Sequence, residues 1–137
     1  MGKRWLATLF SCLFFLAVAF ALRLQFLLPL STLTGERTYY LNSPSSQAVC
    51  VRSLGVKDIF RVRGQSVRLD IPLAPTEIAE RYGASLVKTE RTGDIVSYYY
   101  RVSGRGGVCV DGEIVNLHIA VSPTQTMVGA PLIFGGY

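Results

Sequence analysis

The sequence predicts an α+β domain: a curved antiparallel β-sheet with one short helix packed on one face, preceded by an N-terminal membrane or signal helix. Three observations predict this fold class. Eighteen residues without a charge, Trp5 to Leu22, directly follow Lys3 and Arg4. Most of the remaining chain consists of short β-prone segments separated by turn residues, with a single helix signal among them. Because helices do not alternate with the strands, parallel crossovers are excluded and the strands pair antiparallel.

An N-terminal apolar segment of this kind is recognised by the protein-translocation machinery as an export or membrane-insertion signal. The rest of the chain is therefore expected outside the cytoplasm. Two interpretations stay open. Small-x-small patterns at 17–19 and 19–21 favour a signal peptide, with secretion after cleavage near Ala19 or Ala21. Apolar residues continue past Arg23 to Leu30, which favours a retained single-pass anchor in the cell membrane. The basic residues in front of the segment then keep the N-terminus in the cytoplasm and the C-terminal domain outside.

Composition and charge describe the exported part only after this segment is removed. We divide the chain into a signal peptide or membrane anchor at 1–23, a linker at 24–37 and an extracytoplasmic α+β domain at 38–137. About a hundred residues suffice for one core and not for two. Three of the fourteen basic residues, Lys3, Arg4 and Arg23, flank the apolar segment, which leaves eleven against nine acidic residues. A net charge of +2 outside the cytoplasm argues against nucleic acid as a partner.

The first half of the domain shows strand patterns. Residues 38–41 and 48–54 are β-prone and flank a turn at 42–46. Residues 57–63 and 66–71 flank Gly64-Gln65, a dipeptide typical of a two-residue hairpin. In the second of these segments apolar and polar residues alternate, which predicts a half-buried strand.

The helix signal lies at 75–82. Pro75 suits the first turn, Glu77 and Glu80 lie where the helix dipole favours acidic side chains, and Gly83 ends the helix. The pattern predicts a helix of barely two turns that depends on packing for its stability.

The segments after the helix predict the rest of the sheet. Residues 85–91 and 95–103 flank a Thr-Gly-Asp turn and form a hairpin, in which Tyr98 and Tyr100 point toward the core. Residues 113–121 form the next strand, and 126–134 form a last strand interrupted at Gly129 and Pro131.

Several short motifs carry a resemblance to a known family. They are YLNS at 40–43, SSQA at 45–48, GA at 83–84, VNLHIA at 115–120 and VGAPLIFG at 128–135. With the tyrosine-rich hairpin, they resemble the short exported YwmB-like proteins of spore-forming Gram-positive bacteria, over most of residues 39–137. The resemblance implies a TATA-box-binding-protein-like fold and an envelope or sporulation context. It supplies no active-site residues, and this chain is shorter than the full YwmB pattern.

Two cysteines of the exported part lie in identical surroundings. Cys50 and Cys109 each stand between two valines, 59 residues apart. Outside the cytoplasm they can form a disulfide, which would stabilise the domain by about 4 kcal/mol in the chain-entropy model. The alternative is two separate buried thiols that act as small apolar residues.

The chain offers little material for catalysis or cofactor binding. A metal site needs several ligands at close spacing, whereas this sequence has one histidine and no Cys-x-x-Cys motif. His118 shares a strand face with Asn116 and Ala120, and we expect a solvated or hydrogen-bonded strand residue rather than a catalytic base. We therefore assign no catalytic, metal-binding or cofactor-binding residues and expect no cofactor.

Basic residues are densest in one region of the domain. Such a group can contact lipid headgroups or cell-wall polymers, and the alternative is an ordinary solvated strand face. The candidate anion-contacting patch consists of Arg52, Lys57, Arg61, Arg63 and Arg68.

Together these patterns predict a non-enzymatic, extracytoplasmic interaction module of the envelope, membrane-tethered or secreted. Its partners are the membrane, through the N-terminal segment, and another envelope protein or a cell-wall polymer. The alternative is an extracytoplasmic hydrolase whose site carries no recognisable motif.

Overall fold

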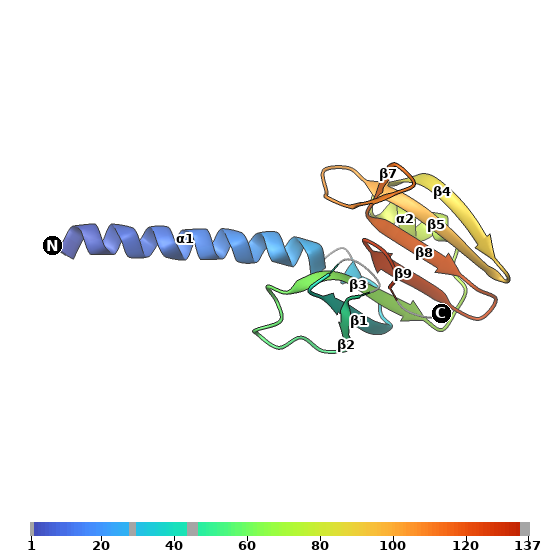
Figure 1. Cartoon of the computed structure of the whole chain (residues 1–137), viewed down its shortest axis with the longest axis horizontal. Helices are drawn as coiled ribbons and strands as arrows, with labels where there is room; N and C mark the ends of the chain where they lie inside the picture. The colour runs from blue at the N-terminus through green and yellow to red at the C-terminus, as the bar shows by residue number, and fades with distance from the viewer. Residues whose placement is uncertain (1, 28–29, 44–46, 135–137) are drawn as a thin grey trace.

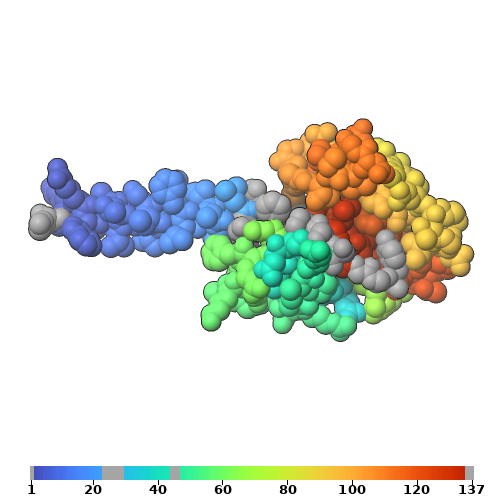
Figure 2. Space-filling view, viewed as in Figure 1, coloured from blue at the N-terminus to red at the C-terminus, as the bar shows by residue number. Residues whose placement is uncertain are grey.

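A computed structural model describes residues 2–27, 30–43 and 47–134 and shows an exposed helix joined to a small α+β domain (Figure 1). The predicted fold class is confirmed. The described residues form a curved, antiparallel, seven-stranded sheet, a short helix packed on it and an apolar helix in front. Helix α1 (Gly2–Leu27) projects from the domain, as the space-filling view also shows (Figure 2).

Helix α1 has the length and composition of a membrane span. Its segment Gly2–Leu22 has a mean hydropathy of 2.3, and none of it is buried. Twenty-one residues at 1.5 Å per residue extend about 31 Å, which matches the hydrocarbon core of a bilayer. The helix therefore fits a membrane anchor or a signal sequence.

The main sheet contains pairs of strands that are neighbours in sequence and pairs that are far apart. All pairs are antiparallel. The strand order is β2 (Val49–Val51), β1 (Glu36–Leu41), β3 (Val62–Leu69), β9 (Thr126–Ala130), β8 (Leu117–Val121), β5 (Ile95–Val102) and β4 (Ala84–Thr92). Two further strands, β6 (Val108–Val110) and β7 (Glu113–Val115), form a separate hairpin.

One face of the sheet, here called the helix face, carries the hydrophobic core. Helix α2 (Pro75–Arg81) packs on it through Ile78 and Ala79. As predicted, Pro75 stands in its first turn, and Gly83 follows its end with a left-handed φ of +60°. The sheet residues of this core alternate along their strands and include Val67, Leu69, Tyr100, Leu117, Ile119 and Val128.

The segment before β1 belongs to the domain, which corrects the predicted linker at 24–37. Leu30 and Leu33 are buried in the core. The Arg37 guanidinium donates hydrogen bonds to the carbonyl oxygens of both, at 2.9 and 3.0 Å, and to Oε1 of Gln65 at 3.1 Å. The domain therefore begins before residue 38, because these leucines are part of its hydrophobic core. Residues 28–29 lie outside the described residues.

The expected hairpin at Gly64-Gln65 was wrong. Strand β3 runs through both residues without a break. Gly64 is needed for close packing rather than for a turn, since a Cβ atom there would lie 2.9 Å from the Ala130 oxygen and from Pro131 Cδ. The chain reverses earlier, in the β2–β3 connection at 52–61. The predicted turn at 42–46 falls partly on residues 44–46, outside the described part.

The predicted strand at 113–121 is split at Asn116. Its side-chain oxygen accepts a hydrogen bond from the Val102 amide at 2.7 Å, and its amide group donates to the Val102 carbonyl at 2.9 Å. A side chain thus replaces a backbone partner at the end of β5, and β7 leaves the sheet while β8 continues it.

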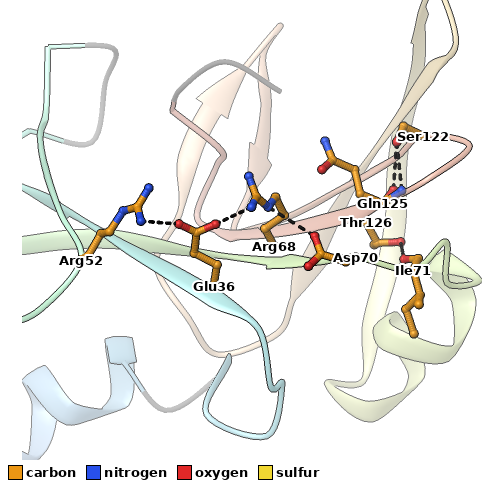
Figure 3. A network of polar contacts seen from close by, with 8 residues as sticks. All are labelled: Glu36, Arg52, Arg68, Asp70, Ile71, Ser122, Gln125 and Thr126. Carbon is orange, nitrogen blue, oxygen red and sulfur yellow. Dashed lines mark hydrogen bonds and ion pairs between the residues drawn. The ribbon is translucent and has the colours of Figure 1, made fainter.

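Thr126, at the start of β9, fixes the segment that leads into α2 (Figure 3). Its buried hydroxyl donates to the Ile71 carbonyl at 2.9 Å and accepts a hydrogen bond from the Leu73 amide at 2.8 Å. The predicted turn at 122–125 precedes it, closed by a bond from the Ser122 amide to the Gln125 carbonyl at 2.9 Å.

Candidate functional site

The face of the sheet opposite α2, here called the second face, carries buried polar side chains. In the central row the registered pairs are Ser66 with Gly129, Gly129 with His118, and His118 with Tyr99. Side chains of paired residues point to the same face, so this row crosses β3, β9, β8 and β5. Ser66 and His118 are buried although α2 packs on the other side.

The C-terminal strap, residues 131–134, covers this row. A Cβ atom on Gly129 would lie 2.7 Å from the backbone of Leu132 and Ile133, so only glycine permits the approach. The Ile133 amide donates to Nδ1 of His118 at 3.3 Å. At the end of the strap the Phe134 ring packs edge-on against Tyr40, 5.2 Å between centroids.

His118 is buried as a neutral side chain. It is 3% exposed, and burial lowers the pKa of its imidazole to about 4, against a weak opposing effect of Glu90. Because Nδ1 accepts the strap hydrogen bond, the neutral ring carries its proton on Nε2. Nε2 is buried without a hydrogen-bond partner among the described residues. The expectation of a solvated or fully hydrogen-bonded His118 was therefore wrong, because the strap excludes water and satisfies one nitrogen only.

A charged cluster lies beside this histidine on the outer strands. The Tyr99 ring stacks on His118 at 4.5 Å between centroids, and its hydroxyl donates to Glu90 at 3.1 Å. Lys88 pairs with Glu90 at 2.5 Å and with Asp111. The Asp111 and Glu90 carboxylates raise the pKa of Lys88, and the ammonium group, followed by the Tyr99 hydroxyl, lowers the pKa of Glu90. The cluster holds Tyr99 against the imidazole.

Among the residues that the structure describes, the second face does not place a nucleophile next to a base. Ser66 and His118 are separated by β9, which corresponds to about 10 Å across two strand spacings. The Ser66 hydroxyl is already bonded by the Tyr40 hydroxyl at 2.8 Å. Within the described residues, His, Cys, Asp and Glu do not gather in any group of three that could hold a metal ion. The geometry is that of a closed polar surface.

The two cysteines of the domain lie on different sheets. Cys50 is in β2, at one edge of the main sheet, and Cys109 is in β6 of the small hairpin. Both are free and exposed, and the described residues contain no disulfide. The structure thus gives no support to the disulfide between Cys50 and Cys109, and it contradicts the alternative of two buried thiols, because both side chains are exposed. Equal sequence surroundings did not bring them together, since β2 and β6 belong to separate strand pairs.

The predicted anion-contacting patch is divided by ion pairs. Arg52 and Arg68 both pair with the Glu36 carboxylate, at 2.7 and 2.6 Å, and Arg68 also pairs with Asp70 at 3.6 Å (Figure 3). Pairing of β1 with β3 brings Glu36 opposite Arg68. The sequence did not predict this ion pair, because the two residues are far apart along the chain. Exposed pairs of this kind contribute about 0–1 kcal/mol each, but they neutralise this half of the patch.

The other half of the patch surrounds the β2–β3 connection. Arg61 pairs with Asp58 at 3.3 Å and donates to Asn42 at 2.9 Å. Arg63 donates to backbone carbonyls of residues 60 and 62, and Lys57 has no ion pair or hydrogen bond with any described residue. This half of the patch therefore keeps a net positive charge.

Comparison with protein-family models, with curated proteins and with solved structures finds no match to this chain. Sequence reasoning missed the strap, although a signal was present: Gly64 and Gly129 both lie inside strands, where glycine marks a close approach of another segment.

Proposed function

We propose that the protein is a non-enzymatic interaction module, held on the outer side of the cell membrane by α1. The observation that carries the proposal is the complete exposure of the apolar segment Gly2–Leu22, next to a domain that packs its own core. A bilayer is the solvent in which such a surface is stable. Lys3 and Arg4 in front of the segment support an orientation with the domain outside.

The retained anchor is favoured over the cleaved, secreted form. Helix α1 continues through Ala19 and Ala21 to Leu27 without a break. Apolar residues also continue past Arg23, which makes the segment longer than the h-region of a signal peptide. Cleavage near Ala19 or Ala21 with secretion of the domain is the alternative.

The arrangement of the second face supports binding rather than catalysis. A general base needs a free basic nitrogen, but Nδ1 of His118 is occupied by the strap and Nε2 carries the proton. The partner is another envelope protein or a cell-wall polymer, and nucleic acid is not proposed. The resemblance to YwmB-like proteins supports an envelope context in a spore former and a TATA-box-binding-protein-like fold.

One observation favours the second candidate, an extracytoplasmic hydrolase. Nε2 of His118 is buried without a partner in the described part of the chain, and perturbed buried groups occur often in active sites. Opening of the strap would expose this nitrogen.

The variant His118→Asn separates the two candidates. An asparagine oxygen can accept the strap hydrogen bond as Nδ1 does, but it cannot act as a base at neutral pH. We expect cross-linking in intact envelopes to join the full-length tagged chain to the same partner in the wild type and in His118→Asn. Hydrolysis of envelope polymer or peptide by the purified full-length protein, lost in His118→Asn, would instead establish the hydrolase.

A further inference from the structure

We propose that the β2–β3 connection, residues 52–61, seats the domain on the anionic lipid surface of the bilayer that α1 spans. This inference rests on the proposed membrane anchoring and adds a second, lipid-contacting surface to it. Three features carry it, namely the position of the connection, its exposed apolar side chains and its charge.

The connection lies at the end of the domain from which α1 leaves (Figure 1). Helix α1 contacts β3, and β3 begins directly after the connection. The charge-free run of α1 ends at Leu22, where Arg23 follows, and the helix ends at Leu27, so about 7.5 Å of helix follows the run. The headgroup layer on each side of a bilayer is about 5–8 Å thick. The base of the domain therefore lies at headgroup level.

Two apolar side chains of the connection point into solvent. Val56 is 83% exposed and Phe60 is 49% exposed. The turn that presents them is ordered, because the Gly55 amide donates to the Asp58 carboxylate at 3.2 Å and the Asp58 carbonyl accepts the Arg61 amide at 2.8 Å. A fixed turn with outward apolar side chains suits insertion into the boundary between headgroups and acyl chains.

This turn and the start of β3 together carry a surplus of positive charge. Residues 55–63 contain Lys57, Arg61 and Arg63 against Asp58, a net charge of +2. Long basic side chains next to apolar ones can lie along the interface while their charged ends contact lipid phosphates. An anionic wall polymer would match the charge but would offer no hydrocarbon to Val56 and Phe60. The bilayer surface satisfies both.

A tryptophan probe in the full-length chain tests this contact. The sequence contains one tryptophan, so Trp5→Phe provides a background without fluorescence from other indoles. Val56→Trp places the probe in the connection. The matched control, Ile71→Trp, is 55% exposed in the wild type and follows the far end of β3, eight residues or about 26 Å along the strand.

Both variants are reconstituted into vesicles of phosphatidylcholine with or without phosphatidylglycerol, and brominated lipids serve as quenchers. With phosphatidylglycerol we expect the probe at residue 56 to shift to the blue and to be quenched about twofold or more, as an interfacial side chain would be. The probe at residue 71 stays water-exposed. Adding Lys57→Glu and Arg63→Glu to the Val56→Trp variant should reduce its quenching to the level seen in pure phosphatidylcholine.

Equal, water-like emission from both probes in anionic vesicles would overturn the lipid contact. Quenching of the probe at residue 56 that is the same with and without phosphatidylglycerol would also overturn it. A blue shift seen only in native envelope vesicles would assign the connection to an envelope protein instead. Vesicle flotation distinguishes the underlying failure: a chain that does not float with the vesicles refutes the anchor, whereas a floating chain with a water-exposed probe refutes only the docking of the connection.

Discussion

Helix α1 and the sheet of the domain are both rich in apolar residues, but they place them oppositely. In α1 the large side chains face outward, and Trp5 is 73% exposed. In the domain Ile119 and Val128 are fully enclosed. The same driving force explains both arrangements if α1 lies in hydrocarbon and the domain in water. The domain thus buries its own apolar side chains, whereas the exposed apolar surface of α1 fits a membrane anchor or a signal sequence.

A change in α1 should have the largest effect. Replacing both Leu13 and Phe14 with arginine places two charges near the centre of the apolar segment, at a cost of about 5–7 kcal/mol for insertion. We expect the full-length protein to lose its membrane association in carbonate extraction, while circular dichroism of the domain is preserved. Trp5→Arg, near the helix end, is the matched control and should stay in the membrane. Retention of the double variant would show that α1 is not the anchor.

A substitution in the core of the sheet should lower the stability of the domain and leave its membrane association unchanged. Leu117 is buried against the core on β8, and Leu117→Ala should lower the free energy of unfolding by about 3 kcal/mol by leaving a cavity. Urea unfolding of the detergent-solubilised chain measures this loss. Leu86→Ala, at an exposed position of edge strand β4, should change stability by less than about 0.5 kcal/mol. Similar losses in both variants would contradict the described core.

Acid should weaken the strap side of the sheet. The pKa of His118 is about 4 in the folded state and 6.5 in the unfolded state, so the unfolded chain binds the proton more readily. The stabilisation is present above pH 6.5 and is lost as the pH falls toward 4, by up to about 3 kcal/mol. Urea unfolding at pH 7 and pH 4.5 measures it. The variant His118→Asn should lose less stability over this interval, and an identical pH dependence in both proteins would refute the buried neutral histidine.

The smallest effect is expected on the exposed ion pairs. Glu36→Gln removes the carboxylate shared by Arg52 and Arg68 and should cost less than about 1 kcal/mol, because solvent screens these charges. High salt should reduce even this difference in urea unfolding. A salt-independent loss of about 2 kcal/mol or more would mean that the network is a structural element of the sheet.

The parts of the fold that follow from local patterns could be predicted. The hairpin of β4 and β5 was expected from its Thr-Gly-Asp turn, and Gly93 there has the left-handed φ of +61° that the turn requires. The core side of β3 was expected from the alternation of Val67 and Leu69. Each of these signals is complete within a few neighbouring residues.

The parts that depend on distant contacts could not be predicted. Gly64 was taken for a turn residue because its neighbour in space, Pro131, is 67 positions away in sequence. Leu30 looked like part of a linker because only tertiary packing shows that it closes the core. The burial of His118 likewise depends on the strap, which crosses strands that the sequence order does not place side by side. The placement of Cys50 and Cys109 on different sheets likewise could not be read from their equal local surroundings.

The central claim is that α1 carries the domain across the membrane and keeps it there. A reporter fused at Tyr137 tests it most directly, with one fusion to an enzyme that is active only outside the cytoplasm and one to an enzyme that is active only inside. We predict activity of the first fusion alone, in the membrane fraction. Activity of the cytoplasmic reporter alone would contradict the account.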